Sequence, residues 1–151
     1  MVWGCITAEG IGYLTRIDGH LNADLYCQIL RDELMKSLEY RNLDTNEIIF
    51  QQDNDPKHTS KLARQWFEEH GIKLLEWPPQ SPDLNPIEHL WAILKRRLNQ
   101  YEGAPSGMNE LWERIETEWA KIDAEVCLNL IKSMPRRVHA VLKAKDGWTD
   151  Y

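Results

Sequence analysis

Residues 48–56 read IIFQQDNDP, a short apolar segment that ends in a cluster of polar, turn-forming residues. Apolar side chains at helical spacing follow over residues 59–71, and a second short apolar segment covers residues 72–77. This order of strand, helix and strand predicts a mostly parallel sheet flanked by helices. Sites in open α/β sheets form beyond the carboxyl ends of the strands. Asp53 directly follows the strand predicted over residues 48–52 and is therefore a candidate site residue. The alternative is that it only forms a turn.

Toward the N-terminus the sequence predicts two strands and one long helix. Residues 1–7 are apolar and β-prone, and residues 13–17 alternate like a half-buried strand. A helix is predicted from Ala23 to about Tyr40, because apolar residues there recur on one helical face. These residues are Leu25, Ile29, Leu30, Leu34 and Leu38.

A proline-rich segment, PPQSPDLNP at residues 78–86, precedes the next helix. Its prolines remove backbone donors and fix φ, so regular structure is excluded there. Asn85 is the predicted N-cap of the following helix, Pro86 its first residue and Glu88 its third, which is the arrangement of a capping box. Glu88 also lies at the rim of the apolar stripe over residues 87–98, where a cleft would open. It is thus a second candidate site residue, with helix capping as the alternative.

Further amphipathic helices are predicted over residues 111–119 and 126–134, and helical spacing resumes at residues 138–142 after an interruption at Pro135. The order of elements is therefore β-β-α-β-α-β-α-α-α. We find neither an internal repeat nor a convincing domain boundary in the sequence. We therefore expect one α/β domain over residues 1–151.

Composition is that of a soluble globular protein, with 42% hydrophobic and 28% charged residues. No apolar run of about 18 residues predicts a membrane span, and no secretory signal is recognised. Three widely separated cysteines indicate neither a disulfide framework nor a zinc site. The expectation is a reduced intracellular compartment, without a membrane partner.

The net charge of −6 argues against a nucleic-acid binder, but the basic residues are clustered. They gather at Lys95, Arg96 and Arg97 and again at Arg136 and Arg137. These clusters are candidate nucleic-acid contacts; the alternative is that each is a solvated helix face.

His58 and its neighbour Lys57 follow the turn that begins at Asp53. His58 is a candidate metal ligand or phosphate contact; the alternative is a structural or solvated histidine.

Two longer motifs contain both candidate carboxylates. Residues 50–60, FQQDNDPKHTS, resemble the second catalytic motif of Tc/mariner transposases, and residues 75–91, LEWPPQSPDLNPIEHLW, resemble the third. Thirty-four residues separate Asp53 from Glu88, as in the Tc-like branch of that family. Residues 133–145 are also similar to the family's C-terminus, so the resemblance covers the whole chain.

The resemblance implies a ribonuclease H-like mixed sheet flanked by helices, with a helical C-terminal part. It further implies that Asp53 and Glu88 are two of three acidic ligands for a pair of Mg²⁺ (or Mn²⁺) ions, with nucleic-acid contacts from Lys57, His58 and the two basic clusters. The family's first Asp lies on a central strand before the segment that resembles residues 1–5. We therefore expect a chain that is incomplete at its N-terminus, lacks that strand and binds metal more weakly.

The function implied is Mg²⁺-dependent DNA strand cleavage and transfer in cut-and-paste transposition, in the nucleus. With its first catalytic Asp absent, the chain is expected to be inactive alone, so its status as an enzyme stays open. DNA is the expected partner, with a homodimer or a full-length transposase as further partners. The alternative function is a non-enzymatic module that binds DNA or a transposase.

Overall fold

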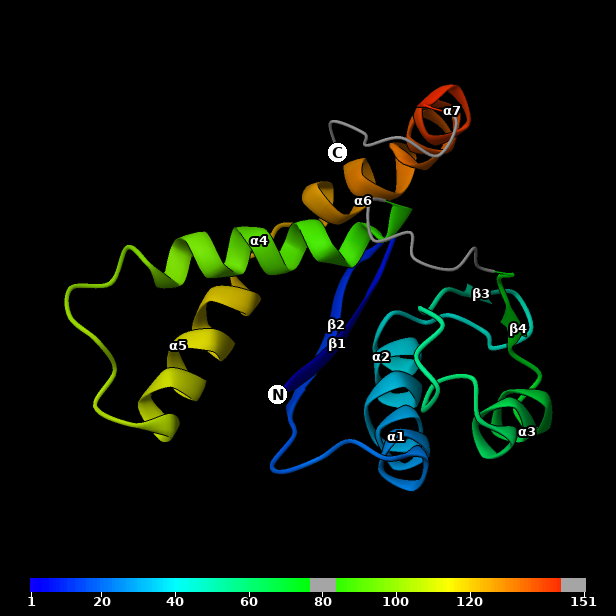
Figure 1. Cartoon of the computed structure of the whole chain (residues 1–151), viewed down its shortest axis with the longest axis horizontal. Helices are drawn as coiled ribbons and strands as arrows, with labels where there is room; N and C mark the ends of the chain where they lie inside the picture. The colour runs from blue at the N-terminus through cyan, green and yellow to red at the C-terminus, as the bar shows by residue number, and fades with distance from the viewer. Residues whose placement is uncertain (77–83, 145–151) are drawn as a thin grey trace. The chain divides into compact units, whose positions relative to one another are not determined.

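The computed structural model describes residues 1–76 and 84–144, and the chain divides into two compact units (Figure 1). The first unit contains Met1–Cys5 and Gly12–Ser81, and the second contains Ile6–Ile11 and Pro82–Tyr151. The prediction for Trp77 and most of the proline-rich segment falls outside the described residues.

The chain begins with a β-hairpin of β1 (Val2–Thr7) and β2 (Gly10–Arg16). Met1 and Ile17 exchange both backbone hydrogen bonds, at 2.8 and 3.1 Å. Such a reciprocal pair is the mark of antiparallel strands. Both predicted strands are thus confirmed, and the second begins three residues earlier than expected.

Gly12 allows the hairpin to approach the following helix closely. A Cβ at this position would lie 2.7 Å from Ser37 Oγ and would also overlap Cys5 Sγ. Ser37 Oγ accepts a hydrogen bond from the Tyr13 amide at 2.8 Å and donates one to the Glu33 carbonyl at 2.6 Å. One buried hydroxyl therefore joins β2 to the helix, and only a residue without a side chain fits opposite it.

The predicted helix over residues 23–40 is confirmed as one continuous helical segment, made of α1 (Ala23–Ile29), a π-helical turn η1 (Leu30–Leu34) and α2 (Met35–Tyr40). In an α-helix, side chains four residues apart drift by about 40° around the axis at each step. The π turn, in which the Met35 amide bonds the Leu30 carbonyl, holds more residues per turn and offsets this drift. It keeps four core side chains on one face: Tyr26, Leu30, Leu34 and Leu38.

The central part of the first unit is a strand–helix–strand unit of β3 (Ile49–Phe50), α3 (Lys61–Glu69) and β4 (Lys73–Leu74). β3 and β4 are parallel, with Phe50 opposite Leu74, as the sequence predicted. Both strands are shorter than expected, because they pair only with each other in the described residues. α3 begins after Ser60, whose Oγ accepts from the Ala63 amide at 3.1 Å.

The described helices of the second unit are α4 (Pro86–Leu98), α5 (Met108–Ala120), α6 (Ala124–Lys132) and α7 (Met134–Ala144). α4 packs on α5 and α6, and α6 packs on α7. The rings of Trp91 and Trp119 stack with centroids 5.2 Å apart, joining α4 to α5. Pro135 lies in the first turn of α7, where its missing amide proton costs no helical bond. Pro135 therefore marks the start of α7, and the predicted interruption of the helical pattern is the break between α6 and α7.

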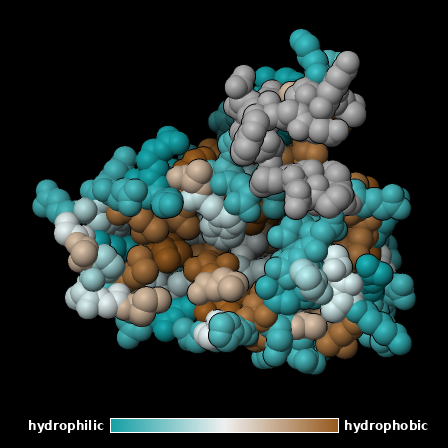
Figure 2. Space-filling view, viewed as in Figure 1, coloured by the Kyte–Doolittle hydropathy of each residue, from teal (hydrophilic) through white to brown (hydrophobic). Residues whose placement is uncertain are grey.

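The surface carries mainly hydrophilic side chains on the visible face, with hydrophobic patches between them (Figure 2). Cys5, Cys27 and Cys127 are buried free thiols. Within the described ranges, no helix is long and apolar enough to cross a membrane.

Candidate functional site

Asp53 lies three residues beyond β3, at the carboxyl end of the parallel pair. Its side chain is 57% exposed. The loop that carries it closes in a turn in which the amides of His58 and Thr59 both bond the Asp55 carbonyl, at 2.9 and 3.0 Å. The strand therefore fixes one end of the loop, and this turn fixes the other.

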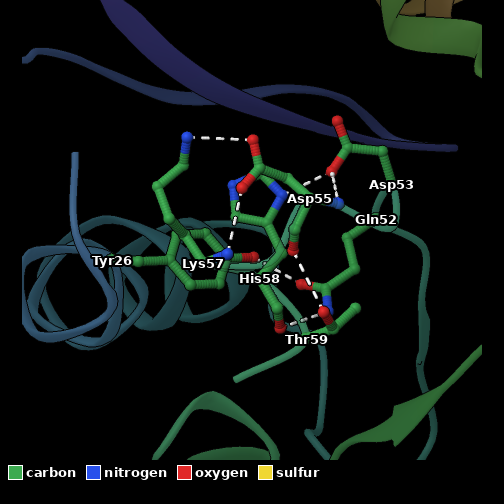
Figure 3. Close-up of polar contacts among 7 residues, drawn as sticks. All are labelled: Tyr26, Gln52, Asp53, Asp55, Lys57, His58 and Thr59. Atoms are coloured by element: carbon green, nitrogen blue, oxygen red, sulfur yellow. Dashed lines mark hydrogen bonds and ion pairs between the residues drawn. The ribbon is translucent and has the colours of Figure 1, made fainter. Parts of the chain in front are cut away.

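The Asp53 carboxylate is held through one of its two oxygens (Figure 3). His58 Nδ1 lies 2.5 Å from Asp53 Oδ1, and the Asp55 amide donates to the same oxygen at 3.1 Å. The second oxygen points away from the other residues drawn. An oriented, exposed carboxylate with one oxygen directed outward is suited to bind a hard cation such as Mg²⁺.

His58 is held firmly against the interior of the first unit. Its ring packs on the Tyr26 ring, with centroids 4.3 Å apart and a tilt of 36°. Tyr26 donates from its hydroxyl to Gln52 Oε1 at 2.5 Å, and Gln52 Nε2 donates to the His58 carbonyl at 2.9 Å. His58 Nε2 is buried and has no hydrogen-bond partner among the described residues.

Asp55 and Lys57 form a second ion pair in the same loop. Lys57 Nζ lies 2.9 Å from Asp55 Oδ2, and the Lys57 amide donates to Asp55 Oδ1 at 2.9 Å. Burial opposes ionisation of Asp55, but the hydrogen bonds and the charge of Lys57 outweigh it and lower the pKa of Asp55. Lys57, a predicted nucleic-acid contact, is thus paired with a carboxylate here.

Glu88 occupies the first turn of α4, where it is exposed. Asn85 has the extended backbone of an N-cap and Pro86 follows it in the first turn, as predicted. The Glu88 amide bonds the Asn85 carbonyl at 3.2 Å. A carboxylate in the first turn is also favoured by the helix dipole. The Asn85 side chain itself makes no capping bond to the described part of this turn, so one half of the expected capping box is not formed.

The predicted basic contacts fall into two kinds. Lys95, Arg96 and Arg136 are exposed. Arg97 instead donates to the Glu118 carbonyl at 3.1 Å.

Arg137 is only 2% exposed. Its Nε donates to Ser133 Oγ at 2.7 Å, and its Nη1 lies 3.2 Å from His89 Nδ1. This guanidinium joins α7 to the C-terminal end of α6 and to α4. Its contact with a nucleic acid stays a prediction, and it would require the buried side chain to become exposed.

Sequence reasoning did not find Tyr26 and Gln52, which support His58. Tyr26 is one of several apolar residues on its helix, and its pattern carries no signal of a polar contact 26 residues away. Among residues 1–76 and 84–144, no group of three or more His, Cys, Asp or Glu side chains is placed to hold a metal ion.

The family model of the DDE superfamily endonucleases matches residues 1–111. The chain therefore belongs to the DDE superfamily endonuclease family. Within it, the chain is of the Tc/mariner transposase type, as its relatives indicate. It is 44% identical over 151 residues to the Tcb1 transposase of Caenorhabditis briggsae and 43% identical to the Tc1 transposase of Caenorhabditis elegans. The match covers 100% of this chain but 54% of each relative, so the chain spans about half of their length.

Solved structures of Mos1 transposase share the fold. The Mos1 catalytic domain with raltegravir and Mg aligns with a TM-score of 0.86 at 23% identity, over 99% of this chain and 76% of that chain. A pre-cleavage Mos1 transpososome aligns with a TM-score of 0.87 at 22% identity, over 99% of this chain and 45% of that chain. The predicted ribonuclease H-like fold is thereby confirmed.

Proposed function

We propose that this chain supplies metal-binding carboxylates for DNA strand cleavage and transfer in cut-and-paste transposition. The observation that carries the proposal is Asp53: it belongs to the second family motif, follows a parallel strand and presents an exposed, oriented carboxylate. Membership of the DDE superfamily endonuclease family supports the same reaction class.

The proposed cofactor is Mg²⁺ or Mn²⁺. Bound ions of this kind activate a water or a 3′-hydroxyl and stabilise the leaving oxygen of a phosphodiester. The Asp53 and Glu88 carboxylates would serve as oxygen ligands to the metal, and neither would act as nucleophile. The exposure of both side chains supports this role, because a ligand must reach the ion and its hydration shell. Mos1 catalytic domain structures have been solved with Mg and with Mn.

The family's first Asp has no counterpart that we recognise in residues 1–151. Asp18 lies outside the motifs that carry the resemblance, and its exposed carboxylate pairs with Arg16 Nε at 2.7 Å. We therefore propose that a polypeptide of residues 1–151 alone binds metal more weakly than a full ligand set would and does not cleave DNA.

DNA is the proposed partner, in the nucleus, where chromosomal DNA lies. Structures of Mos1 include a paired-end complex and a strand transfer complex, which supports a DNA-bound assembly. A homodimer or a complex with a full-length transposase is the proposed assembly for this chain.

A chimera tests the proposed function. Residues 1–151 would replace the matching part of Tcb1 transposase, and excision of the Tcb1 element from a plasmid would be measured in Mg²⁺. Excision is expected, with complete loss on Asp53→Asn or Glu88→Gln and no loss on Asp18→Asn. A chimera that excises with Asp53→Asn would overturn the metal-ligand role. DNA cleavage by residues 1–151 alone, abolished by Asp53→Ala, would overturn the proposed inactivity.

A second candidate function is DNA binding without catalysis, favoured by the adjacent exposed side chains of Lys95 and Arg96 at the end of α4. Such binding weakens steeply with salt, because phosphate contacts release counterions. Replacing both residues with Ala should lower the slope of log K against log salt by about 2. Lys121→Ala is the control, because Lys121 is already paired with Glu118 at 2.7 Å. A slope that is unchanged by the double replacement would count against this interface.

A further inference from the structure

His58 contacts the proposed metal ligand through a defined atom pair. Its Nδ1 lies 2.5 Å from Asp53 Oδ1. An ionised carboxylate can only accept hydrogen bonds, so the proton of this contact must be on Nδ1. The other ring nitrogen, Nε2, is buried without a partner among the described residues. Nε2 is unpaired in either neutral tautomer, so the contact with Asp53 decides where the proton lies.

The ring is fixed independently of Asp53. Tyr26 is 1% exposed and covers one face of the imidazole, with ring centroids 4.3 Å apart. Gln52 joins the Tyr26 hydroxyl to the His58 carbonyl, through bonds of 2.5 and 2.9 Å. Both the side chain and the backbone of His58 are therefore set by the core of the first unit, and Asp53 is exposed at the end of this chain of contacts.

We infer that His58 is a positioning residue for Asp53: its Nδ1–H holds Oδ1, so that Oδ2 is presented to a divalent cation. This inference rests on the proposed function. It gives His58 a role that differs from a direct metal or phosphate contact, because Nδ1 is engaged and Nε2 is buried. Hydrogen-bond partners of metal-binding carboxylates restrict the carboxylate's orientation, and losing one typically weakens metal binding about 10- to 100-fold.

Two replacements of His58 separate positioning from packing. In His58→Asn, the side-chain amide nitrogen overlies the Nδ1 position and can still donate to Asp53. In His58→Gln, the amide reaches the Nε2 position instead and loses that donor. Both variants are neutral and lose the aromatic ring, so a purely structural role would affect them alike.

The experiment uses ¹⁵N-labelled residues 1–151 and Mn²⁺ alone as the probe. Paramagnetic broadening of the amide signals of residues 52–55 gives the Mn²⁺ affinity, even when binding is weak. We expect His58→Gln to bind Mn²⁺ about 10-fold more weakly than the unaltered chain, and His58→Asn to stay within about twofold. His70→Ala is the matched control. His70 also stacks on an aromatic ring, Trp66 at 4.0 Å, but its Nδ1 contacts a carbonyl rather than a carboxylate. Equal affinities for the Asn and Gln variants would overturn the inference.

A metal-free measurement distinguishes failure of the inference from failure of the proposed function. Imidazole ¹⁵N spectra should show a proton on His58 Nδ1, with a changed shift in Asp53→Asn. A neutral ring protonated only on Nε2 would overturn the positioning role and leave the proposed function intact. Mn²⁺ broadening that persists in Asp53→Asn, or is absent from the unaltered chain, would overturn the metal assignment of the proposed function instead.

Discussion

The hydroxyl of Tyr26 supports the candidate site from the core, and Tyr26→Phe removes it while keeping the ring against His58. A hydrogen bond of this kind contributes a net 0.5–1.5 kcal/mol, and a buried acceptor left unpaired costs about 1–3 kcal/mol. Gln52 is half-buried, so water can partly replace the lost donor. We therefore expect a loss of about 1–2 kcal/mol, or a 5- to 30-fold increase in the unfolding equilibrium constant.

Urea unfolding followed by the NMR signals of residues 23–40 and 49–74 measures this loss within the first unit. Tyr40→Phe is the matched control, because Tyr40 is 66% exposed and the chemical change is identical. The control should change the free energy of unfolding by less than about 0.5 kcal/mol. A Tyr26→Phe effect no larger than that of Tyr40→Phe would refute the view that the Tyr26–Gln52 bond holds the loop.

Three further predictions concern stability. Gly12→Ala should cost about 1–3 kcal/mol in the same urea titration, through overpacking against Ser37. Burial raises the pKa of the Tyr26 hydroxyl above its ordinary value of 10.0. The unfolded chain therefore loses this proton first, stability falls as pH rises past about 10, and Tyr26→Phe should flatten that fall in a series of melts at increasing pH. Arg137→Ala should destabilise the second unit by about 2 kcal/mol, because a buried charge-assisted contact is lost. Arg136→Ala should weaken only DNA binding, so equal melting temperatures for the two variants would contradict this prediction.

Local patterns predicted the elements of this fold well. Apolar spacing was sufficient for the helix over residues 23–40, and the signals at Asn85 and Pro86 placed the start of α4 correctly. The lengths of β3 and β4 were overestimated, because each apolar segment extends beyond the residues that pair in the sheet. The π turn at Leu30–Leu34 was not predicted. It depends on how the apolar side chains that recur every four residues on this helix pack against the core.

The site was predictable only in its exposed part. The motif containing Asp53 and His58 is continuous in sequence, so a resemblance could identify it. Tyr26 contributes from a helix that precedes the motif, and its contact with Gln52 spans 26 residues. Arg136 and Arg137 look equivalent in sequence, but the 100° rotation between neighbours on a helix places one outward and buries the other. Such differences depend on long-range packing, which periodicity does not record.

Asp53 forms a turn and is also proposed to bind metal, and the geometry makes these roles compatible. The Asp55 amide and His58 Nδ1 both bond Oδ1, so turn formation leaves Oδ2 for another partner. Asp53→Asn separates the two roles, because an amide oxygen can still accept both bonds and Asn favours turns as Asp does. The variant should keep the free energy of unfolding within about 0.5 kcal/mol of the unaltered chain while losing Mn²⁺ binding. If Asp53→Asn instead unfolded the loop, its charge would be needed for the turn itself, and a loss of metal binding could no longer be attributed to the missing ligand.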